Sequence, residues 1–518
     1  MVIEGKHIVA LILVVIVLAF SFQGTRGIWS PDEGFYIPIA KTMLSSGDFL
    51  IPKLNDETWL EKPPLLYWGI AAGMFALGEN ELGARAFTAL CFVLTTVIVF
   101  LLGKSMWGKR EGTIAGVIYC TTIIPFAASN IVTPDTPLVL WTTLAFFFFW
   151  QSVKPGASKI SMWKLLMCAS FGLGFISKGP AAIIPAAGMF AFLLFRGKLR
   201  EYFITTWALA GFAIFSVLGL SWYFMVGKEE AGAIAYFFDN QVVGRTISEK
   251  YNRNPGVRGA FIYLPVLLFG TLPWSFIWYS DALRRRCFIN PKSWWLDFRK
   301  NPVNLFIMSW FVVPFIILLA ANSRLPLYLL PLFPAISLAT ARKLSLVTLE
   351  TQKERSPGLF PKHVVLVGTW VILLIGFKLA AAYYPSERDM RSFWRDIAVS
   401  LPGSNNYEFI VLDEYYEGLS FYGLENLEMV TKKKKPYPCF VMPENLKSEI
   451  KEIALSNRQH VIICEGVKSV AYVCNELRLA GVGFKQSKLS FDRWVIICKP
   501  EALPIETRNL FPADHKAT

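Results

Sequence analysis

Charged residues are scarce in this sequence. Asp, Glu, Lys and Arg make up 17% of the 518 residues, against 54% hydrophobic and 15% aromatic residues. Soluble domains are rarely more than about half apolar and lack long continuous apolar runs. The mean hydropathy of +0.43 therefore excludes an ordinary soluble protein and indicates a membrane protein.

Cysteines in metal-ligand spacing are also lacking. No pair among the eight cysteines has the spacing of a zinc site. Those in the polar C-terminal region allow a disulfide, but the sequence does not define a pairing. Cys91, Cys120, Cys168 and Cys287 lie in or beside apolar stretches, and Cys439, Cys464, Cys474 and Cys498 lie in the C-terminal region.

A basic surface suited to nucleic acid is missing despite the net charge of +14. The basic residues gather in short loops between apolar stretches, where they report membrane topology. We therefore expect no nucleic-acid partner. The first apolar stretch also lacks a small-residue cleavage site, so we interpret it as a retained membrane span and not a signal peptide.

What the sequence does contain is a series of apolar stretches from His7 to about Ala382. A stretch of about 20 such residues crosses the hydrocarbon core of a bilayer. We expect an α-helical multi-pass membrane protein of roughly 11 to 13 transmembrane helices. The stretches are residues 7–23, 84–103, 112–128, 135–152, 162–177, 180–196, 203–226, 258–280, 303–320, 327–343 and 363–382.

The loops alternate in charge, which predicts their orientation. Under the positive-inside rule the basic loops are cytoplasmic. The alternate loops and the C-terminal tail then face the exterior. The basic loops contain Lys104, Lys109 and Arg110; Lys154, Lys159 and Lys164; Arg196, Lys198 and Arg200; Arg284 to Lys300; and Arg342 to Lys362, while the exterior loops are 24–83, 129–134, 177–178, 227–257 and 321–326.

The composition changes near Tyr383, which predicts two domains: a membrane domain over residues 1–382, with external loops 24–83 and 227–257, and a soluble periplasmic domain over 383–518. Strand-like runs alternate with helical ones in the tail, which favours a small α/β domain. We expect strands at Phe409–Leu412, Val461–Cys464 and Trp494–Cys498, and helices at Glu444–Leu455 and Val467–Leu479. Nothing in the tail indicates catalysis, and the run Lys432–Lys435 is interpreted as a solvated loop or a contact with membrane lipids.

Two external loops place a carboxylate beside the start of a helix. In Ser30-Pro31-Asp32-Glu33, Ser30 is a candidate N-cap and Glu33 a candidate capping-box partner, so a purely structural role would explain both acids. Thr133-Pro134-Asp135-Thr136 repeats the arrangement. The alternative is that Asp32 and Asp135 are catalytic carboxylates on one side of the membrane.

The external loops also hold candidate phosphate ligands. In Glu61-Lys62-Pro63-Pro64, Lys62 precedes a proline-initiated helix, which suits a phosphate site. An ion pair between Glu61 and Lys62 is the structural alternative. The other candidates are Lys178 in a tight turn, Arg245 in the long loop, and Arg324 and Tyr328 in the last short turn.

These motifs together resemble the bacterial lipid A aminoarabinose transferases. That family belongs with the dolichyl-phosphate-mannose protein mannosyltransferases in the GT-C glycosyltransferase superfamily. The resemblance extends over residues 1 to about 345, and the tail matches only in kind. It is carried by Pro31-Asp32-Glu33, Leu44–Leu54, Glu61-Lys62-Pro63-Pro64-Leu65-Leu66-Tyr67-Trp68, Arg85, Ser177-Lys178-Gly179-Pro180 and Arg324-Leu325-Pro326-Leu327-Tyr328.

The resemblance implies a GT-C fold in the bacterial inner membrane and transfer of a sugar from undecaprenyl phosphate on the periplasmic side. The sugar is expected to be 4-amino-4-deoxy-L-arabinose or another, and the acceptor lipid A or another envelope molecule. Asp32 would be the key carboxylate near the reacting centre, with Asp135 in support. The carrier phosphate would be held by Lys62, Arg245 and either Lys178 or Arg324, beside Tyr328.

One departure from the family concerns a metal. Relatives hold a divalent metal with a Glu at the position of Glu61 and a His from the long external loop. Segment 227–257 contains no histidine, and Asn240 or Asn252 stands about where one is expected. Either the metal is absent, or it is a harder ion bound by oxygen atoms.

Two alternative functions remain. A protein O-mannosyltransferase-like enzyme shares the superfamily and differs in its acceptor. A transporter or flippase of lipid-linked sugars belongs to another class and predicts charges near span midpoints and an internal repeat. The sequence shows neither feature, which favours chemistry at one membrane face.

Overall fold

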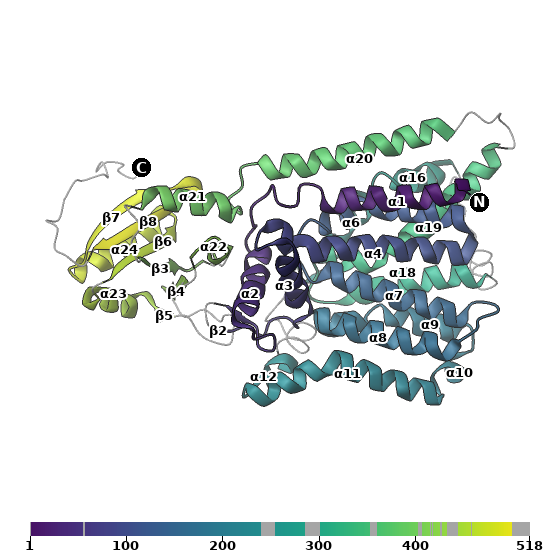
Figure 1. Cartoon of the computed structure of the whole chain (residues 1–518), viewed down its shortest axis with the longest axis horizontal. Helices are drawn as coiled ribbons and strands as arrows, with labels where there is room; N and C mark the ends of the chain where they lie inside the picture. Colours follow the sequence, from purple (N-terminus) through teal and green to yellow (C-terminus); the bar gives the residue numbers. More distant parts are fainter. Residues whose placement is uncertain are drawn as a thin grey trace. The chain divides into compact units, whose positions relative to one another are not determined.

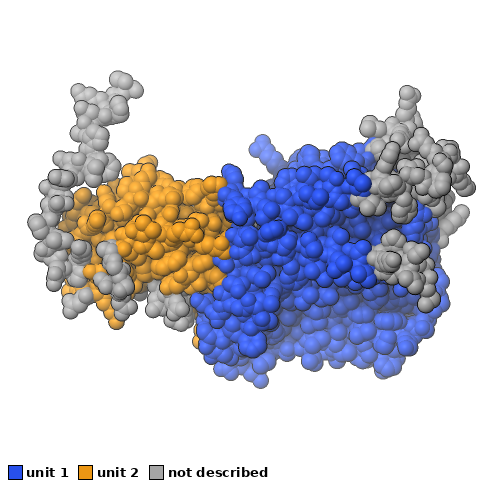
Figure 2. Space-filling view, turned by 45° about the horizontal axis from the view of Figure 1, so that its top comes forward, with its two compact units in different colours: residues 1–26, 39–52, 59–384 blue, residues 27–38, 53–58, 385–518 orange. Residues whose placement is uncertain are grey.

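The computed structural model describes residues 2–54, 57–239, 254–284, 301–352, 360–401, 407–414, 416, 418–424, 427–432, 444–456 and 458–499. The chain forms two compact units (Figure 2). Unit 1 comprises Met1–Arg26, Ile39–Pro52 and Trp59–Tyr384, and unit 2 comprises Gly27–Pro38, Lys53–Thr58 and Pro385–Thr518. Two segments of the loop 24–83, which the sequence predicts to be external, therefore group with the C-terminal residues.

Unit 1 is built from α-helices that lie side by side (Figure 1). Helix α4 packs against α1, α3, α5 and α7, and α8 packs between α7 and α11. The helices are α1 (Val2–Phe20), α3 (Leu65–Leu77), α4 (Glu81–Trp107), α5 (Lys109–Thr121), α6 (Ile123–Ala128), α7 (Asp135–Val153), α8 (Ile160–Lys178), α9 (Ala186–Phe195), α10 (Leu199–Phe203), α11 (Thr206–Glu229), α12 (Ala233–Tyr236), α14 (Gly256–Ala260), α15 (Tyr263–Leu268), α16 (Ser275–Arg284), α18 (Pro302–Ala320), α19 (Phe333–Gln352) and α20 (Phe360–Tyr383), with 3-10 helices η1 (Gly179–Ile183) and η4 (Pro326–Leu332).

Seven helical segments within the described ranges are long and apolar enough to cross a membrane. The prediction of a multi-pass helical membrane protein is confirmed. Predicted spans 112–128, 180–196 and 258–280 fall on shorter, interrupted helices, because prolines such as Pro125, Pro185 and Pro265 interrupt helical hydrogen bonding. The seven segments are Glu81–Trp107, Asp135–Val153, Ile160–Ile183, Thr206–Glu229, Pro302–Ala320, Pro326–Leu346 and Val365–Tyr383.

Small and aromatic residues pack the helices that lead to the site. A Cβ atom on Gly219 of α11 would lie 3.3 Å from the Gly172 Cα of α8, so glycines permit the close approach of these helices. Phe146 of α7 stacks on Trp310 of α18 with ring centroids 3.9 Å apart. These contacts fix α7 and α8, whose ends carry predicted site residues.

Unit 2 contains a six-stranded sheet in the order β5-β4-β3-β6-β8-β7. Strands β5, β4, β3 and β6 are parallel, whereas β8 pairs antiparallel with β6 and β7. The predicted α/β domain, its three strands and the helix at Val467–Leu479 are confirmed. The helix predicted at Glu444–Leu455 begins at Leu446, because Glu444 and Asn445 pair with β4. The elements are α21 (Met390–Ser400), β3 (Tyr407–Leu412), α22 (Gly418–Phe421), β4 (Leu427–Thr431), β5 (Glu444–Asn445), α23 (Leu446–Leu455), β6 (Gln459–Glu465), α24 (Val467–Leu479), β7 (Gly483–Lys488), η5 (Ser490–Asp492) and β8 (Arg493–Lys499).

The sheet of unit 2 is covered on both faces, because inward residues alternate along its strands. Ile462 packs with α23 and α24 residues on one face, and Val461 and Ile463 pack with α21 and α22 residues on the other. The external-loop part of unit 2 contains the start of α2 (Asp32–Ser46) and the short strands β1 (Lys53–Leu54) and β2 (Glu57–Thr58).

Candidate active site

Asp135 and Lys178 form a buried ion pair in unit 1. Asp135 opens α7 after Pro134, and Lys178 ends α8. Each charge suits its helix terminus, since acids are favoured at the N-terminus and cations at the C-terminus. Because α7 and α8 pack against each other, the Lys178 ammonium reaches the Asp135 carboxylate, and each side chain is only 10% exposed.

Tyr328 of η4 completes this group. The Lys178 Nζ lies 4.8 Å from the centroid of the Tyr328 ring. The structure thus brings together three residues that the sequence nominated separately. An ammonium has three N–H donors, so Lys178 retains donors for a ligand oxygen beyond its bond to Asp135.

Glu61 and Lys62 form a second ion pair, with 2.6 Å between Lys62 Nζ and Glu61 Oε1. The pair precedes Pro63 and Pro64, after which α3 begins at Leu65. Lys62 is 6% exposed, so a charge is held out of solvent at the start of this apolar helix. The ion pair that we considered as the structural alternative is present.

A hydrophobic cluster connects the two ion-paired segments. Leu60, next to Glu61, and Ile176, two residues before Lys178, belong to the same buried cluster. Trp222 of α11 also belongs to it, and its indole N–H donates to the Leu50 carbonyl over 2.8 Å. The segment before α3 and the end of α8 are therefore fixed against the same apolar side chains.

Arg324 is engaged with main-chain carbonyl groups. Its Nη1 donates to the carbonyls of Asn254 and Gly256 at 3.1 and 2.7 Å. Its Nε and Nη2 both donate to the Leu319 carbonyl at the end of α18, at 3.2 and 2.7 Å. In this structure the guanidinium joins the start of α14 to α18, and this role accounts for most of its donors.

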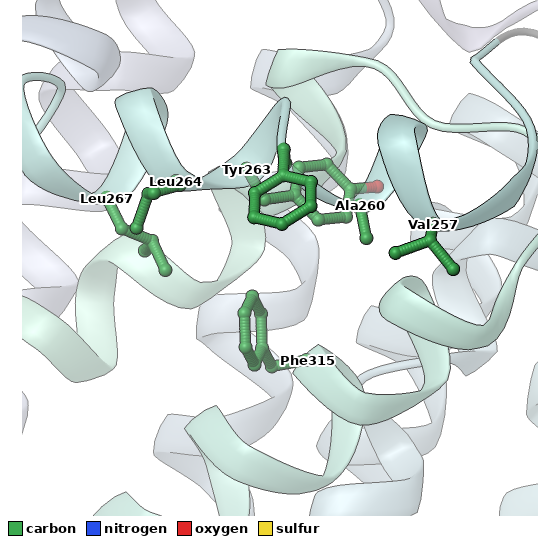
Figure 3. A pocket seen from close by; sticks show the side chains of 7 residues that line it. Val257, Ala260, Tyr263, Leu264, Leu267 and Phe315 are labelled. Atoms are coloured by element: carbon green, nitrogen blue, oxygen red, sulfur yellow. The ribbon is translucent and has the colours of Figure 1, made fainter.

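An apolar pocket of about 250 Å³ begins at Val257, the residue after Gly256 (Figure 3). Tyr263 of α15 lines the pocket. The Tyr263 hydroxyl is buried without a hydrogen-bond partner in the described part of the chain. Sequence reasoning missed this residue because one tyrosine in an apolar stretch resembles an interfacial anchor. The lining residues are Val257, Ala260, Phe261, Tyr263, Leu264, Leu267 and Phe315.

Asp32 belongs to unit 2, where it is the exposed first residue of α2. The buried Glu33 carboxylate accepts a hydrogen bond from the Trp29 N–H at 3.0 Å. The Ser30 N–H, by contrast, donates to the Arg388 carbonyl. The predicted capping box between Ser30 and Glu33 is wrong. It requires the Ser30 N–H to donate to the Glu33 carboxylate, whereas this N–H donates to a main-chain carbonyl of unit 2.

Other residues of the sequence motifs have structural roles or are not described. Arg85 is 1% exposed, and its Nη1 donates to the Gln23 and Arg26 carbonyls at 2.6 and 2.8 Å. It fixes the chain that follows α1. Arg245, Asn240 and Asn252 lie outside the described residues.

The described residues do not form a divalent-metal site. Glu61 is the expected ligand, but its carboxylate contacts the Lys62 ammonium, which competes with a cation for the same oxygen. No group of three or more His, Cys, Asp or Glu side chains suited to a metal occurs within the described ranges.

Three comparisons bear on the family. Residues 61–223 match the model of the dolichyl-phosphate-mannose-protein mannosyltransferase family. An undecaprenyl phosphate-alpha-4-amino-4-deoxy-L-arabinose arabinosyl transferase of Pectobacterium carotovorum is 27% identical over 387 residues, covering 73% of this chain and 65% of that protein. An uncharacterized protein of Aquifex aeolicus is 28% identical over 392 residues, covering 73% of this chain and 72% of its own length.

The fold agrees with these similarities. A crystal structure of ArnT from Cupriavidus metallidurans bound to undecaprenyl phosphate superposes with a TM-score of 0.76 at 18% identity, covering 95% of this chain and 97% of that one. Part of this chain is thus similar to a mannosyltransferase family, and its fold is similar to that of ArnT. The family match begins at Glu61, includes Asp135 and Lys178, and ends on α11 at Tyr223. The two ion pairs of unit 1 thus lie within the segment that matches the family model.

Proposed function

We propose that this protein transfers a sugar from undecaprenyl phosphate to an acceptor at the external face of the bacterial inner membrane. The first pair to test is 4-amino-4-deoxy-L-arabinose as the sugar and lipid A as the acceptor. The observation that carries the proposal is the buried Asp135–Lys178 pair beside Tyr328, near a pocket suited to an apolar chain. The named relatives support the same donor class.

The reaction breaks the bond between the anomeric carbon and the carrier phosphate oxygen and forms a bond to an acceptor oxygen. Negative charge grows on the departing phosphate, so a nearby ammonium stabilises the transition state more than the ground state. We assign this role to Lys178 and Lys62, which lie at 10% and 7% side-chain exposure. Low exposure limits screening by water and strengthens their attraction to phosphate.

Tyr328 and Arg324 take different parts in this proposal. Tyr328 orients Lys178 through its ring. Arg324 shapes the pocket by fixing residues 254–256, and we propose that the pocket takes part of the polyprenyl chain. The buried Tyr263 hydroxyl gives a residue of this pocket a polar group. Arg245 is retained as a further phosphate ligand on the resemblance alone.

Asp32 is proposed as the carboxylate near the acceptor. A hydroxyl acceptor needs a base to remove its proton, whereas a phosphate acceptor is already a nucleophile. Asp32 is exposed at the start of α2. Asp135 supports the site by fixing the Lys178 ammonium.

The orientation follows from charge. The turns and loops 104–110 and 154–164 are basic, whereas Glu61, Lys62, Asp135 and Lys178 belong to the alternate set of loops. Under the positive-inside rule the basic set is cytoplasmic, so the site and unit 2 face the periplasm.

A transfer assay tests the proposal. Purified protein in lipid nanodiscs is incubated with undecaprenyl-phosphate sugars and with lipid A or a Ser/Thr-containing peptide, and the products are identified by mass spectrometry. We expect sugar on lipid A with the wild type, at least a hundredfold less with Asp32→Ala and Lys62→Ala, and normal transfer with Lys198→Ala, an exposed lysine of a basic loop. Transfer to the peptide would identify a protein O-mannosyltransferase-like acceptor. Lipid movement across the bilayer without any transfer would contradict the proposal in favour of a flippase.

A further inference from the structure

The segment that carries Asp32 is attached to the C-terminal part of the chain by main-chain hydrogen bonds. The Met390 N–H donates to the Ile28 carbonyl at 2.9 Å, and the Ser30 N–H donates to the Arg388 carbonyl at 3.0 Å. Between these bonds, Trp29 and Asp389 form an antiparallel β-bridge. We call residues 27–38 the acidic segment.

A side chain adds to this attachment. The Tyr422 hydroxyl, from the turn after α22, accepts a hydrogen bond from the Ile28 N–H at 2.9 Å. Ile28 is fully buried, so this N–H has no access to water. A buried N–H that loses its acceptor destabilises the conformation that holds it. The Tyr422 hydroxyl therefore fixes the main chain four residues before Asp32.

Two glycines allow the close contact on either side of Asp32. A Cβ atom on Gly34 would lie 3.1 Å from the Gly418 main-chain nitrogen of α22. A Cβ atom on Gly27 would lie 1.9 Å from an Asp389 carboxylate oxygen, and that same carboxylate caps α21 by accepting from the Arg391 and Ser392 N–H groups. Larger residues at Gly27 or Gly34 would push the acidic segment away from these elements.

The two acids of the acidic segment differ in burial. Within α2, Glu33 is fully buried and bonded to Trp29, whereas the adjacent Asp32 is exposed. The contacts at Ile28, Ser30 and Gly34 lie on both sides of Asp32 in the sequence. The segment is thus fixed before and after a carboxylate that remains accessible.

We propose that the C-terminal domain is a positioning device for the Asp32 carboxylate, with Tyr422, Gly418 and Asp389 as positioning residues. This inference rests on the proposed function for its catalytic consequence. A displacement of about 1 Å at a reacting group is enough to lower a rate by about a hundredfold. Loosening the attachment is therefore expected to lower kcat while leaving the KM for the carrier-linked sugar unchanged, because no phosphate ligand is altered.

The test uses full-length protein in nanodiscs with Tyr422→Phe, and Gly34→Ala as a second variant if the first does not fold. The matched control is Val473→Ala, which creates a cavity on the opposite face of the sheet, away from the acidic segment. Hydrogen–deuterium exchange of peptides covering residues 27–38 is measured with kcat and KM. We expect faster exchange in the acidic segment and a kcat at least tenfold lower for Tyr422→Phe, with neither change for Val473→Ala after correction for folded fraction.

The outcomes separate this inference from the proposed function. Unchanged exchange in residues 27–38 of Tyr422→Phe would overturn the attachment. Faster exchange with unchanged kcat, or an equal loss of kcat in Val473→Ala, would overturn the positioning role. Absence of transfer by the wild type with every donor would overturn the proposed function and with it the catalytic consequence, while the exchange data would still decide whether the C-terminal domain holds the segment.

Discussion

At the scale of single residues, the Asp135–Lys178 pair affects both the folding stability of the protein and, in our proposal, the binding of the carrier phosphate. Both side chains are 90% removed from solvent, and an ion left alone in such surroundings is strongly destabilising. Breaking a buried pair on one side typically costs about 3–5 kcal/mol, whereas neutralising both partners costs much less. The two effects of Lys178 are therefore separable by mutation.

Lys178→Met is expected to lower the thermal unfolding temperature, because it leaves the Asp135 carboxylate unpaired. Asp135→Asn combined with Lys178→Met should restore most of that stability without restoring binding of undecaprenyl phosphate. Thermal unfolding and carrier binding in detergent measure the two effects. Equal unfolding temperatures for the single and double variants, or normal carrier binding by the double variant, would contradict the assignment.

His460 of β6 makes the stability of unit 2 depend on pH. Burial lowers the pKa of its imidazole, with a smaller opposing effect from the Glu408 carboxylate 3.3 Å away. The unfolded state, with an ordinary pKa near 6.5, then binds a proton that the folded state does not. The contribution of neutral His460 to the free energy of unfolding is present above about pH 6.5 and is lost as the pH falls below this value.

We expect the free energy of unfolding of unit 2 to decrease between pH 7.5 and 5.0 more steeply in the wild type than in His460→Gln. Denaturant unfolding of the full-length protein, followed by exchange of peptides from β6, gives this slope. Parallel slopes for the two proteins would show that His460 does not titrate differently on folding.

The sequence identified several site residues, but it did not predict their contacts. Asp135, Lys178 and Tyr328 stood out because polar residues beside apolar spans are costly and few. Their association was not predictable, because it depends on α7, α8 and η4 meeting in space. Arg324 was nominated as a phosphate ligand from its place in the last short external turn and from the resemblance. Its carbonyl partners are 68 and 70 residues away in sequence, or on the preceding helix.

At the scale of elements, long uniform segments were predictable and interrupted ones were not. Strands β3, β6 and β8 have apolar cores that the sequence revealed, whereas β7 (Gly483–Lys488) is polar and depends on pairing with β8. The span predicted at 258–280 is divided into α14, α15 and part of α16. The prolines within it made the interruption foreseeable, but the hydrogen bonds that hold its start depend on Arg324.

The junction between α14 and α18 provides a prediction at this scale. Arg324→Lys keeps the charge but cannot reproduce the planar set of donors that reaches the Asn254, Gly256 and Leu319 carbonyls. We expect faster hydrogen exchange in peptides from 254–268 and at least tenfold weaker carrier binding. Weaker binding without a change in exchange would instead indicate direct contact between Arg324 and the phosphate.

At the scale of the whole molecule, the cysteines of unit 2 report whether this unit is folded. Burial raises the pKa of the Cys464 and Cys498 thiols to about 12 and also raises that of Cys474. Thiolates are the reactive form, so these cysteines should resist maleimide in the native protein at pH 7.5 and react once unit 2 unfolds. Peptide mass spectrometry over a denaturant series measures this. Rapid labelling of Cys464 or Cys498 without denaturant would contradict the burial.

The attachment of residues 27–38 also has a consequence for biosynthesis. Ile28 leaves the ribosome long before Tyr422, its hydrogen-bond acceptor, which is 394 residues further along the chain. Because chains fold progressively from the N-terminus, the segment around Asp32 must remain without its final partners until nearly every span has been inserted. A chain that ends before Tyr422 because of a premature stop codon would lack the hydrogen-bond acceptor that fixes the segment around Asp32. We therefore expect such truncated chains to be inactive.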